Sequence, residues 1–172
     1  MSCYRAKPIS RNDIRQYVRY LKNLIGLEKL YYFPIVQFVE IFLPLLMPDF
    51  DFAVSPIEEL RDKHGETNPS DKTIRIREDV YLGAVAGNGR DRLTMAHEVG
   101  HLLFHGDGAV VLCRLGPNEC LKAYEDPEWQ ASAFGGELLA SSYLIKGMSV
   151  AEVQKKCGVS FSAAEMQLRS LR

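Results

Sequence analysis

The chain has 172 residues, of which 47% are hydrophobic, and its formal net charge at pH 7 is −1. A chain of this size and composition can bury one hydrophobic core, so we predict a single domain over residues 1–172. The near-zero net charge excludes the overall positive charge that drives nonspecific binding to nucleic acids.

The cysteines indicate a reducing compartment. None of the four forms a C-x-x-C pair, so the sequence indicates neither a thiolate zinc site nor a disulfide framework. No basic segment followed by an apolar run and a cleavage site marks the start of the chain for export. We therefore expect a cytoplasmic protein. The four cysteines are Cys3, Cys113, Cys120 and Cys157.

The first part of the chain is predicted to be a helical scaffold. Ser10, with Asp13 three residues later, is a typical helix start. The most apolar stretch, residues 31–47, contains prolines and polar residues and is too short to span a bilayer, so we expect no membrane association. It is predicted to be a buried helix that begins at Pro34 and ends at Pro44. The first helix carries an apolar stripe of Ile14, Val18, Leu21 and Ile25.

Two strand-like segments follow. Residues 50–54 and 73–77 alternate apolar with polar or small side chains, which is typical of half-buried strands. The intervening residues, 61–72, are charged and contain glycine, asparagine and proline, so we predict a surface loop. A strand with a free edge beside a metal site could pair with an extended substrate, whereas a strand paired on both sides could not.

The sequence H-E-V-G-H over residues 97–101 has the spacing of a metal-binding helix. A helix is predicted from Asp91 to Phe104, between two glycine-containing turns. Because residues four apart share a helix face, His97 and His101 can bind one metal ion, with Glu98 placed as the base for a metal-bound water. Gly100 costs the helix about 1 kcal/mol against alanine, so we predict close approach of a neighbouring backbone there.

A catalytic zinc ion usually has three protein ligands, so a third is needed. The metzincin pattern fails, since Phe104 and Asp107 replace its glycine and its last histidine. His105 lies about 12 Å along the helix axis from His97, so it is predicted to be a helix-end histidine favoured by the helix dipole. The third ligand should be acidic and come from a second helix, predicted over 127–139 with Asp126 as its N-cap. Its candidates are Glu125 and Glu128.

Two segments together resemble the ImmA/IrrE family of zinc metallopeptidases: A-H-E-V-G-H-L-L-F-H at 96–105 and E-W-Q-A-S-A-F-G-G-E-L-L at 128–139. The resemblance covers roughly residues 50–172. It implies a zinc ion held by His97, His101 and Glu128, with Glu98 as the catalytic base. Ser132 replaces the usual asparagine, and Gly135 and Gly136 replace two alanines, which should soften this helix. Ala140 and Ser141 replace the usual Met-Pro.

The fold class implied is α+β: a mostly helical, zincin-like metallopeptidase domain with a small β-sheet and a C-terminal helical pair like a helix-turn-helix. Five basic residues against two acidic ones give the last segment a local excess of three positive charges, but we predict packing or partner docking there rather than direct DNA binding. The predicted segments are 1–48 (scaffold), 49–142 (sheet and metal-binding helices) and 143–172 (helical pair).

The function expected is that of a zinc-dependent endopeptidase with a narrow substrate. The resemblance implies that the substrate is a DNA-binding repressor or antitoxin-like regulator encoded nearby. The alternative is a non-proteolytic, toxin-like partner of a regulator in a two-protein, toxin–antitoxin type module. A donor for the oxyanion remains open among His105, Tyr81, Arg90 and Arg92.

Overall fold

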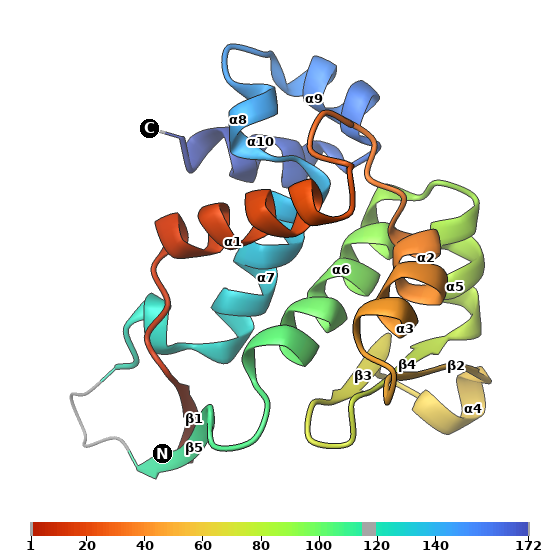
Figure 1. Ribbon diagram of the computed structural model, residues 1–172, viewed down its shortest axis with the longest axis vertical. Helices are drawn as coiled ribbons and strands as arrows, with labels where there is room; N and C mark the ends of the chain where they lie inside the picture. The colour runs from red at the N-terminus through yellow and green to blue at the C-terminus, as the bar shows by residue number, and fades with distance from the viewer. Residues whose placement is uncertain (1, 115–119, 172) are drawn as a thin grey trace.

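The computed structural model describes residues 2–114 and 120–171. Its centre is a pair of helices that lie side by side, α6 (Gly89–Phe104) and α7 (Pro127–Leu139) (Figure 1). Helix α1 packs against α7, and the three-stranded sheet lies at the opposite side of α6. The predicted α+β class is confirmed. The remaining bounds are α2 (Ile35–Gln37), η1 (Phe38–Phe42), α3 (Leu43–Leu46), α4 (Ile57–Leu60), α5 (Glu78–Val85), η2 (Ala123–Glu125) and α8 (Ser142–Ile145).

The main sheet has the strand order β2 (Asp51–Ser55), β4 (Thr73–Arg77), β3 (Gly65–Asn68). Strands β2 and β4 are parallel, whereas β3 pairs antiparallel with β4. The prediction of a surface loop over 61–72 was therefore wrong in its middle part. The sequence G-E-T-N carries no apolar alternation, and it becomes a strand because β4 supplies backbone partners. Consequently β4 is central, and the edge beside α6 belongs to β3.

A second, two-stranded sheet joins the beginning of the chain to the segment after α6. Strand β1 (Ser2–Ala6) pairs antiparallel with β5 (Val110–Arg114). Neither strand was predicted. From this pairing the chain runs past the beginning of α7 and into α1 (Arg11–Leu24), as the lower left of Figure 1 shows.

The N-terminal helices agree with the predictions made from the sequence, with one exception. Helix α1 begins at Ser10 with the predicted capping box, in which the Ser10 and Asp13 side chains each accept a hydrogen bond from the other's backbone N–H. The second helical stretch continues through Pro44 to Leu46, so the prediction that Pro44 ends it was wrong. The Leu43 N–H donates to the carbonyl of Phe38, five residues back, and this wider turn accommodates the proline ring inside the helix.

Two glycines bring α6 and α7 close together. A Cβ added to Gly100 would lie 2.9 Å from the Cα of Ala131, so the predicted close approach of a neighbouring backbone is confirmed. Gly135 makes the reciprocal contact, since a Cβ there would lie 3.2 Å from the backbone nitrogen of His97. We expected Gly135 to soften α7, and its contact shows that it also permits the close packing that brings the first turn of α7 beside the two histidines.

The C-terminal helices have the predicted order of helix, glycine turn and helix. They are α9 (Val150–Cys157), Gly158 with a φ of 62°, and α10 (Phe161–Arg169). Arg92, on α6, has a buried guanidinium that donates to the carbonyls of Cys157 and Gly158 in this turn. The same guanidinium also donates to the carbonyl of Phe33. Across residues 2–114 and 120–171, the structure contains no helix with the length and apolar character needed to cross a membrane.

A buried lysine lies in the core between α1 and α7. The Nζ atom of Lys22 donates to the Leu138 carbonyl (3.3 Å) and the Ser141 hydroxyl (2.9 Å), and it lies 5.3 Å from the centre of the Phe33 ring. Burial lowers the pKa of Lys22 to about 8. The folded protein therefore holds this proton less tightly than the unfolded chain does.

We expect the lysine to make stability rise with pH. From about pH 8 up to the ordinary lysine pKa, the unfolded chain binds more protons, so the free energy of unfolding increases as pH increases. Relative to Lys22→Met, the wild type should gain about 2 kcal/mol between about pH 7.5 and about pH 9.5, measured by urea unfolding. Lys29→Met, at an exposed position, is the matched control and should follow the wild type.

Candidate active site

The structure brings the three predicted metal ligands together. His97 and His101 lie on consecutive turns of α6, and Glu128 lies in the first turn of α7. Asp126 caps α7 by accepting a hydrogen bond from the Glu128 backbone N–H (2.9 Å). The two histidine Nε2 atoms are 3.0 Å apart, and the Glu128 carboxylate oxygens lie 3.2 Å from His97 Nε2 and 3.3 Å from His101 Nε2.

The separation of the two histidine nitrogens is close to that around a tetrahedral metal ion, and the three potential ligand atoms lie within 4.8 Å of one another. A zinc ion with bonds of about 2.0–2.2 Å keeps its ligand atoms roughly 3.3 Å apart. Two imidazole nitrogens and one carboxylate oxygen are also the donor set of a hydrolytic zinc site that leaves one position open. Within the part of the chain that the structure describes, the group of side chains able to hold a metal contains Glu128 and not Glu125. The geometry therefore favours Glu128 as the third ligand.

Electrostatics agree with the geometry. Hydrogen bonding to His101 and His97 lowers the pKa of the Glu128 carboxyl well below its usual range, and this outweighs the opposing effect of partial burial. Glu128 is thus ionised at neutral pH, as a metal ligand must be.

A chain of hydrogen bonds orients His101. The Gln130 amide nitrogen donates to the carbonyls of Lys7 (2.7 Å) and Tyr124 (2.8 Å), so its Oε1 atom accepts from His105 Nε2 (3.0 Å). The remaining nitrogen of His105, Nδ1, then accepts from His101 Nδ1 (2.9 Å). When a metal ion takes the place of the hydrogen bond between His101 Nε2 and Glu128, this order of donors keeps the ring proton on His101 Nδ1 and leaves the Nε2 lone pair for the metal.

His105 differs from its prediction. It does end α6, but its ring is buried, and burial is the main cause that lowers its pKa. A neutral ring gains little from the helix dipole, so its place is explained by the contact with His101 instead. His97 is oriented by one contact instead of a chain of hydrogen bonds: its Nδ1 lies 3.2 Å from the Ser132 hydroxyl.

Replacing His105 by phenylalanine should weaken metal binding about 10- to 100-fold, the usual cost of losing a group that orients a ligand. The ring volume is kept, but His101 Nδ1 loses its acceptor. Competition with a chromophoric chelator measures the affinity. Tyr81→Phe is the control, because it removes a hydrogen bond to Glu40 outside the site. Equal affinities for wild type and His105→Phe would show that His105 does not orient His101.

Glu98 faces a groove beside the ligands. The hydroxyl of Thr67, on β3, donates to Glu98 Oε2 at 2.6 Å. Gly65 lies against the same side chain, and a Cβ there would come within 2.9 Å of Glu98 Cγ. The groove has a volume of about 400 Å³. Its lining residues are Lys63, His64, Gly65, Arg90, Leu93, Thr94, His97, Glu98 and Ser132.

The structure narrows the choice of an oxyanion donor. His105 is bonded through both ring nitrogens, Arg92 is buried against backbone carbonyls, and Tyr81 donates to Glu40. Of the four predicted candidates, Arg90 lines the groove. His64 also lines it and was not singled out in the sequence, because it lies in the segment predicted to be a loop and has no spacing relation to the H-E-x-x-H motif.

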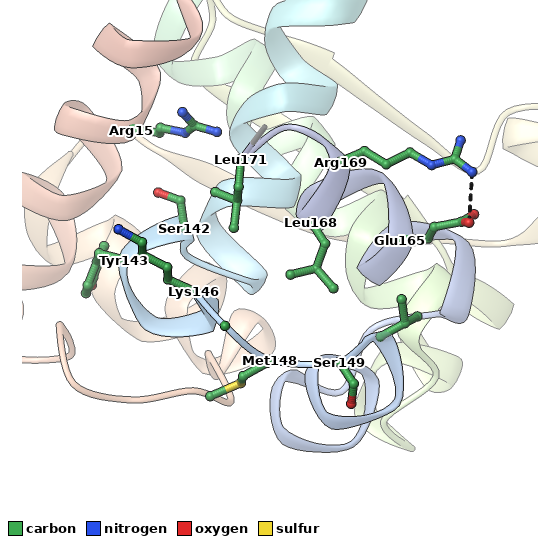
Figure 2. Close-up of a pocket in the computed structure, with 12 residues that line it drawn as sticks. Arg15, Ser142, Tyr143, Lys146, Met148, Ser149, Glu165, Leu168, Arg169 and Leu171 are labelled. Atoms are coloured by element: carbon green, nitrogen blue, oxygen red, sulfur yellow. Dashed lines mark hydrogen bonds and ion pairs between the residues drawn. The ribbon is translucent and has the colours of Figure 1, made fainter.

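A cavity larger than the groove lies elsewhere. It has a volume of about 780 Å³ and is lined by residues of α1, α8, α9 and α10 and of the segments beside them (Figure 2). Three of its charged side chains have partners within the chain, since Arg169 pairs with Glu165 (2.8 Å) and Arg15 donates to the Ser170 carbonyl (2.7 Å). It contains no predicted ligand or base, so size alone does not locate the chemistry.

Comparison with known proteins assigns the chain to a family. A search of curated proteins gives no match. The family model described as the IrrE N-terminal-like domain, a peptidase family, matches residues 50–169, which is more than half of the chain and includes both motifs. The predicted resemblance is thus confirmed, and the chain belongs to the Peptidase_M78 family of metallopeptidases, that of the IrrE N-terminal-like domain.

Proposed function

We propose that this protein is a zinc-dependent endopeptidase that cleaves a specific protein, with a DNA-binding repressor or antitoxin-like regulator as its substrate class. The observation that carries this proposal is the triangle of His97, His101 and Glu128 beside the Glu98 carboxylate in an open groove. A module that only binds its target has no need of a base at this position.

Metal binding and proton transfer are assigned to different residues of the chain. His97, His101 and Glu128 would hold the zinc ion, which supplies Lewis acidity that lowers the pKa of water and polarises a carbonyl group. Glu98 accepts the proton of the attacking water and passes it to the leaving amine. Since Thr67 donates to Glu98 Oε2, the carboxylate keeps a fixed orientation and its other oxygen is left to take the proton.

Strand β3 offers a way to hold the substrate. It forms an edge of the three-stranded sheet, it packs against α6, and Gly65 lines the groove. An extended peptide can add to such an edge through backbone hydrogen bonds. Because β4 is paired on both sides, it cannot serve this role.

His64 is the side chain we propose as the donor to the developing oxyanion. Its Nδ1 lies 3.0 Å from Arg77 Nη2, and a guanidinium can only donate, so Nδ1 accepts and the ring proton is on Nε2. Arg77 is itself held by Asp79 (2.7 and 3.0 Å) and by the Arg61 carbonyl (2.6 Å). His64 is thereby fixed as a donor at the wall of the groove.

His64→Phe should lower kcat by roughly 10²-fold with little change in KM, as expected for loss of one oxyanion donor. His64→Gln, which retains an N–H donor, should recover part of this loss. Lys63→Met is the neighbouring control, since Lys63 also lines the groove but pairs with Glu66 (2.8 Å). A kcat for His64→Phe equal to that of Lys63→Met would exclude the role.

Proteolysis of candidate substrates tests the proposed function. The zinc-loaded protein is incubated with the regulator encoded next to it and, separately, with casein, and fragments are mapped by mass spectrometry. We expect cleavage of the regulator at few sites and slow attack on casein. Rapid casein digestion with an intact regulator would refute the narrow substrate. A stable, uncut complex would instead support the alternative, a non-proteolytic partner of the regulator.

A further inference from the structure

A second cavity adjoins the catalytic groove. It has a volume of about 260 Å³ and is enclosed by α6, α7, α10 and Arg11 of α1. Leu93 and Ser132 line both the cavity and the groove. The Ser132 hydroxyl also contacts His97 Nδ1, so the Ser132 side chain lies between the cavity and the candidate metal site. The other lining residues are Trp129, Ala133, Gly136, Ser162, Ala163, Met166 and Gln167.

The side-chain hydroxyl and amide groups around this cavity have polar partners, whereas Arg11, among the residues that the structure describes, has an aromatic contact without a hydrogen bond. The Arg11 guanidinium lies over the Trp129 ring, 5.0 Å from its centre. Gln167 Nε2 donates to the buried Glu137 carboxylate at 2.6 Å, and the Ser162 hydroxyl lies 3.2 Å from that of Ser160. Apart from the Arg11 guanidinium, the surface left for a ligand is therefore apolar, made by the aromatic ring and by small and aliphatic side chains.

The size of the cavity selects one side chain. Sites for drug-sized ligands hold about 300–1,000 Å³, so 260 Å³ suits a smaller group. Met166 is 69% exposed and lies at the rim of the cavity. Its unbranched thioether side chain can adjust to substrate side chains of different shapes. A cationic side chain would lose its hydration there and would lie near the Arg11 guanidinium, which also lines the cavity.

We propose that this cavity is the specificity subsite of the peptidase and binds one leucine-sized or aromatic apolar side chain of the substrate beside the scissile bond. This inference rests on the proposed function, since it names the substrate residue for that same site. It places substrate selection on α7 and α10, so one helix of the C-terminal helical pair lines the subsite.

Binding of hydroxamates tests the subsite without requiring hydrolysis. Succinyl hydroxamates that carry a leucine, phenylalanine, glycine or aspartate side chain are titrated calorimetrically into the zinc-loaded protein. We expect the leucine or phenylalanine compound to bind at least about 10-fold more tightly than the glycine compound. Tightest binding of the aspartate compound would instead indicate an acidic side chain paired with Arg11 and would overturn the apolar assignment. Equal affinities across the series would overturn the subsite even if the protein cleaves its regulator. Binding of the glycine compound shows separately that the metal site is formed.

Two variants test whether the preference for apolar side chains arises in this cavity. Ala163→Phe fills the cavity and should abolish the preference for apolar side chains, whereas Lys155→Phe adds the same ring at an exposed position of α9 and should keep it. Met166→Ala, at an exposed position, opens the cavity and should shift the preference towards phenylalanine, so it serves even if Ala163→Phe does not fold. A preference unchanged in Met166→Ala and in any folded Ala163→Phe would overturn the assignment.

Discussion

Glu98→Gln should lose at least 10²-fold in the rate of peptide hydrolysis while keeping the fold and the bound metal. The amide preserves the shape of the side chain and can still accept a hydrogen bond from Thr67, but it cannot take a proton from water. Cleavage of the regulator under single-turnover conditions, together with metal content and the melting temperature Tm, measures the three properties on one preparation.

The matched control is Glu66→Gln. Glu66 lies on the same strand as Thr67, one residue away, and its carboxylate pairs with Lys63 rather than facing the metal ligands. This variant undergoes the same chemical change and should cleave at the wild-type rate. If Glu98→Gln cleaves comparably to Glu66→Gln, Glu98 is not the base.

Glu128→Ala should release the metal. A site reduced from three protein ligands to two loses an anionic donor, and the loss of affinity should exceed the roughly 100-fold seen when a merely orienting group is removed. Elemental analysis after gel filtration reports the stoichiometry. Added zinc should no longer raise Tm, because the stabilisation follows the ratio of metal concentration to its dissociation constant.

Glu125→Ala is the comparison for this variant. Glu125 ends η2, two residues before the start of α7, and it was the open alternative for the third ligand. It should retain one zinc ion per chain. The reverse pattern, with full metal in Glu128→Ala and none in Glu125→Ala, would mean that the ligand assignment is wrong.

Features that depend on local spacing were predictable from the sequence. The four-residue separation of His97 and His101 fixes them on one helix face wherever α6 packs. The start of α7 follows from Asp126 and Pro127, which satisfy and pre-organise a helix N-terminus. The capping box of α1 is likewise a contact between residues three apart. The family motifs then select Glu128 where local reasoning leaves two glutamates.

Features that depend on residues far apart in the chain were either not predicted from the sequence or predicted wrongly. The Thr67 contact with Glu98 spans 31 residues, and the His105 contact with Gln130 spans 25. Strand β3 has no apolar alternation and exists because β4 pairs with it. The continuation of a helix through Pro44 depends on a wider turn before it, for which the sequence carries no recognised signal.

The sequence by itself determined the candidate metal-binding pair, the candidate base beside it and the helix that carries the proposed third ligand, because each is encoded within one or two turns of helix. Only the tertiary structure decided which strand borders the groove and which side chains orient the candidate ligands. The physical reason is that these features are hydrogen bonds and pockets between elements far apart in the chain, and no local pattern of residues specifies their partners.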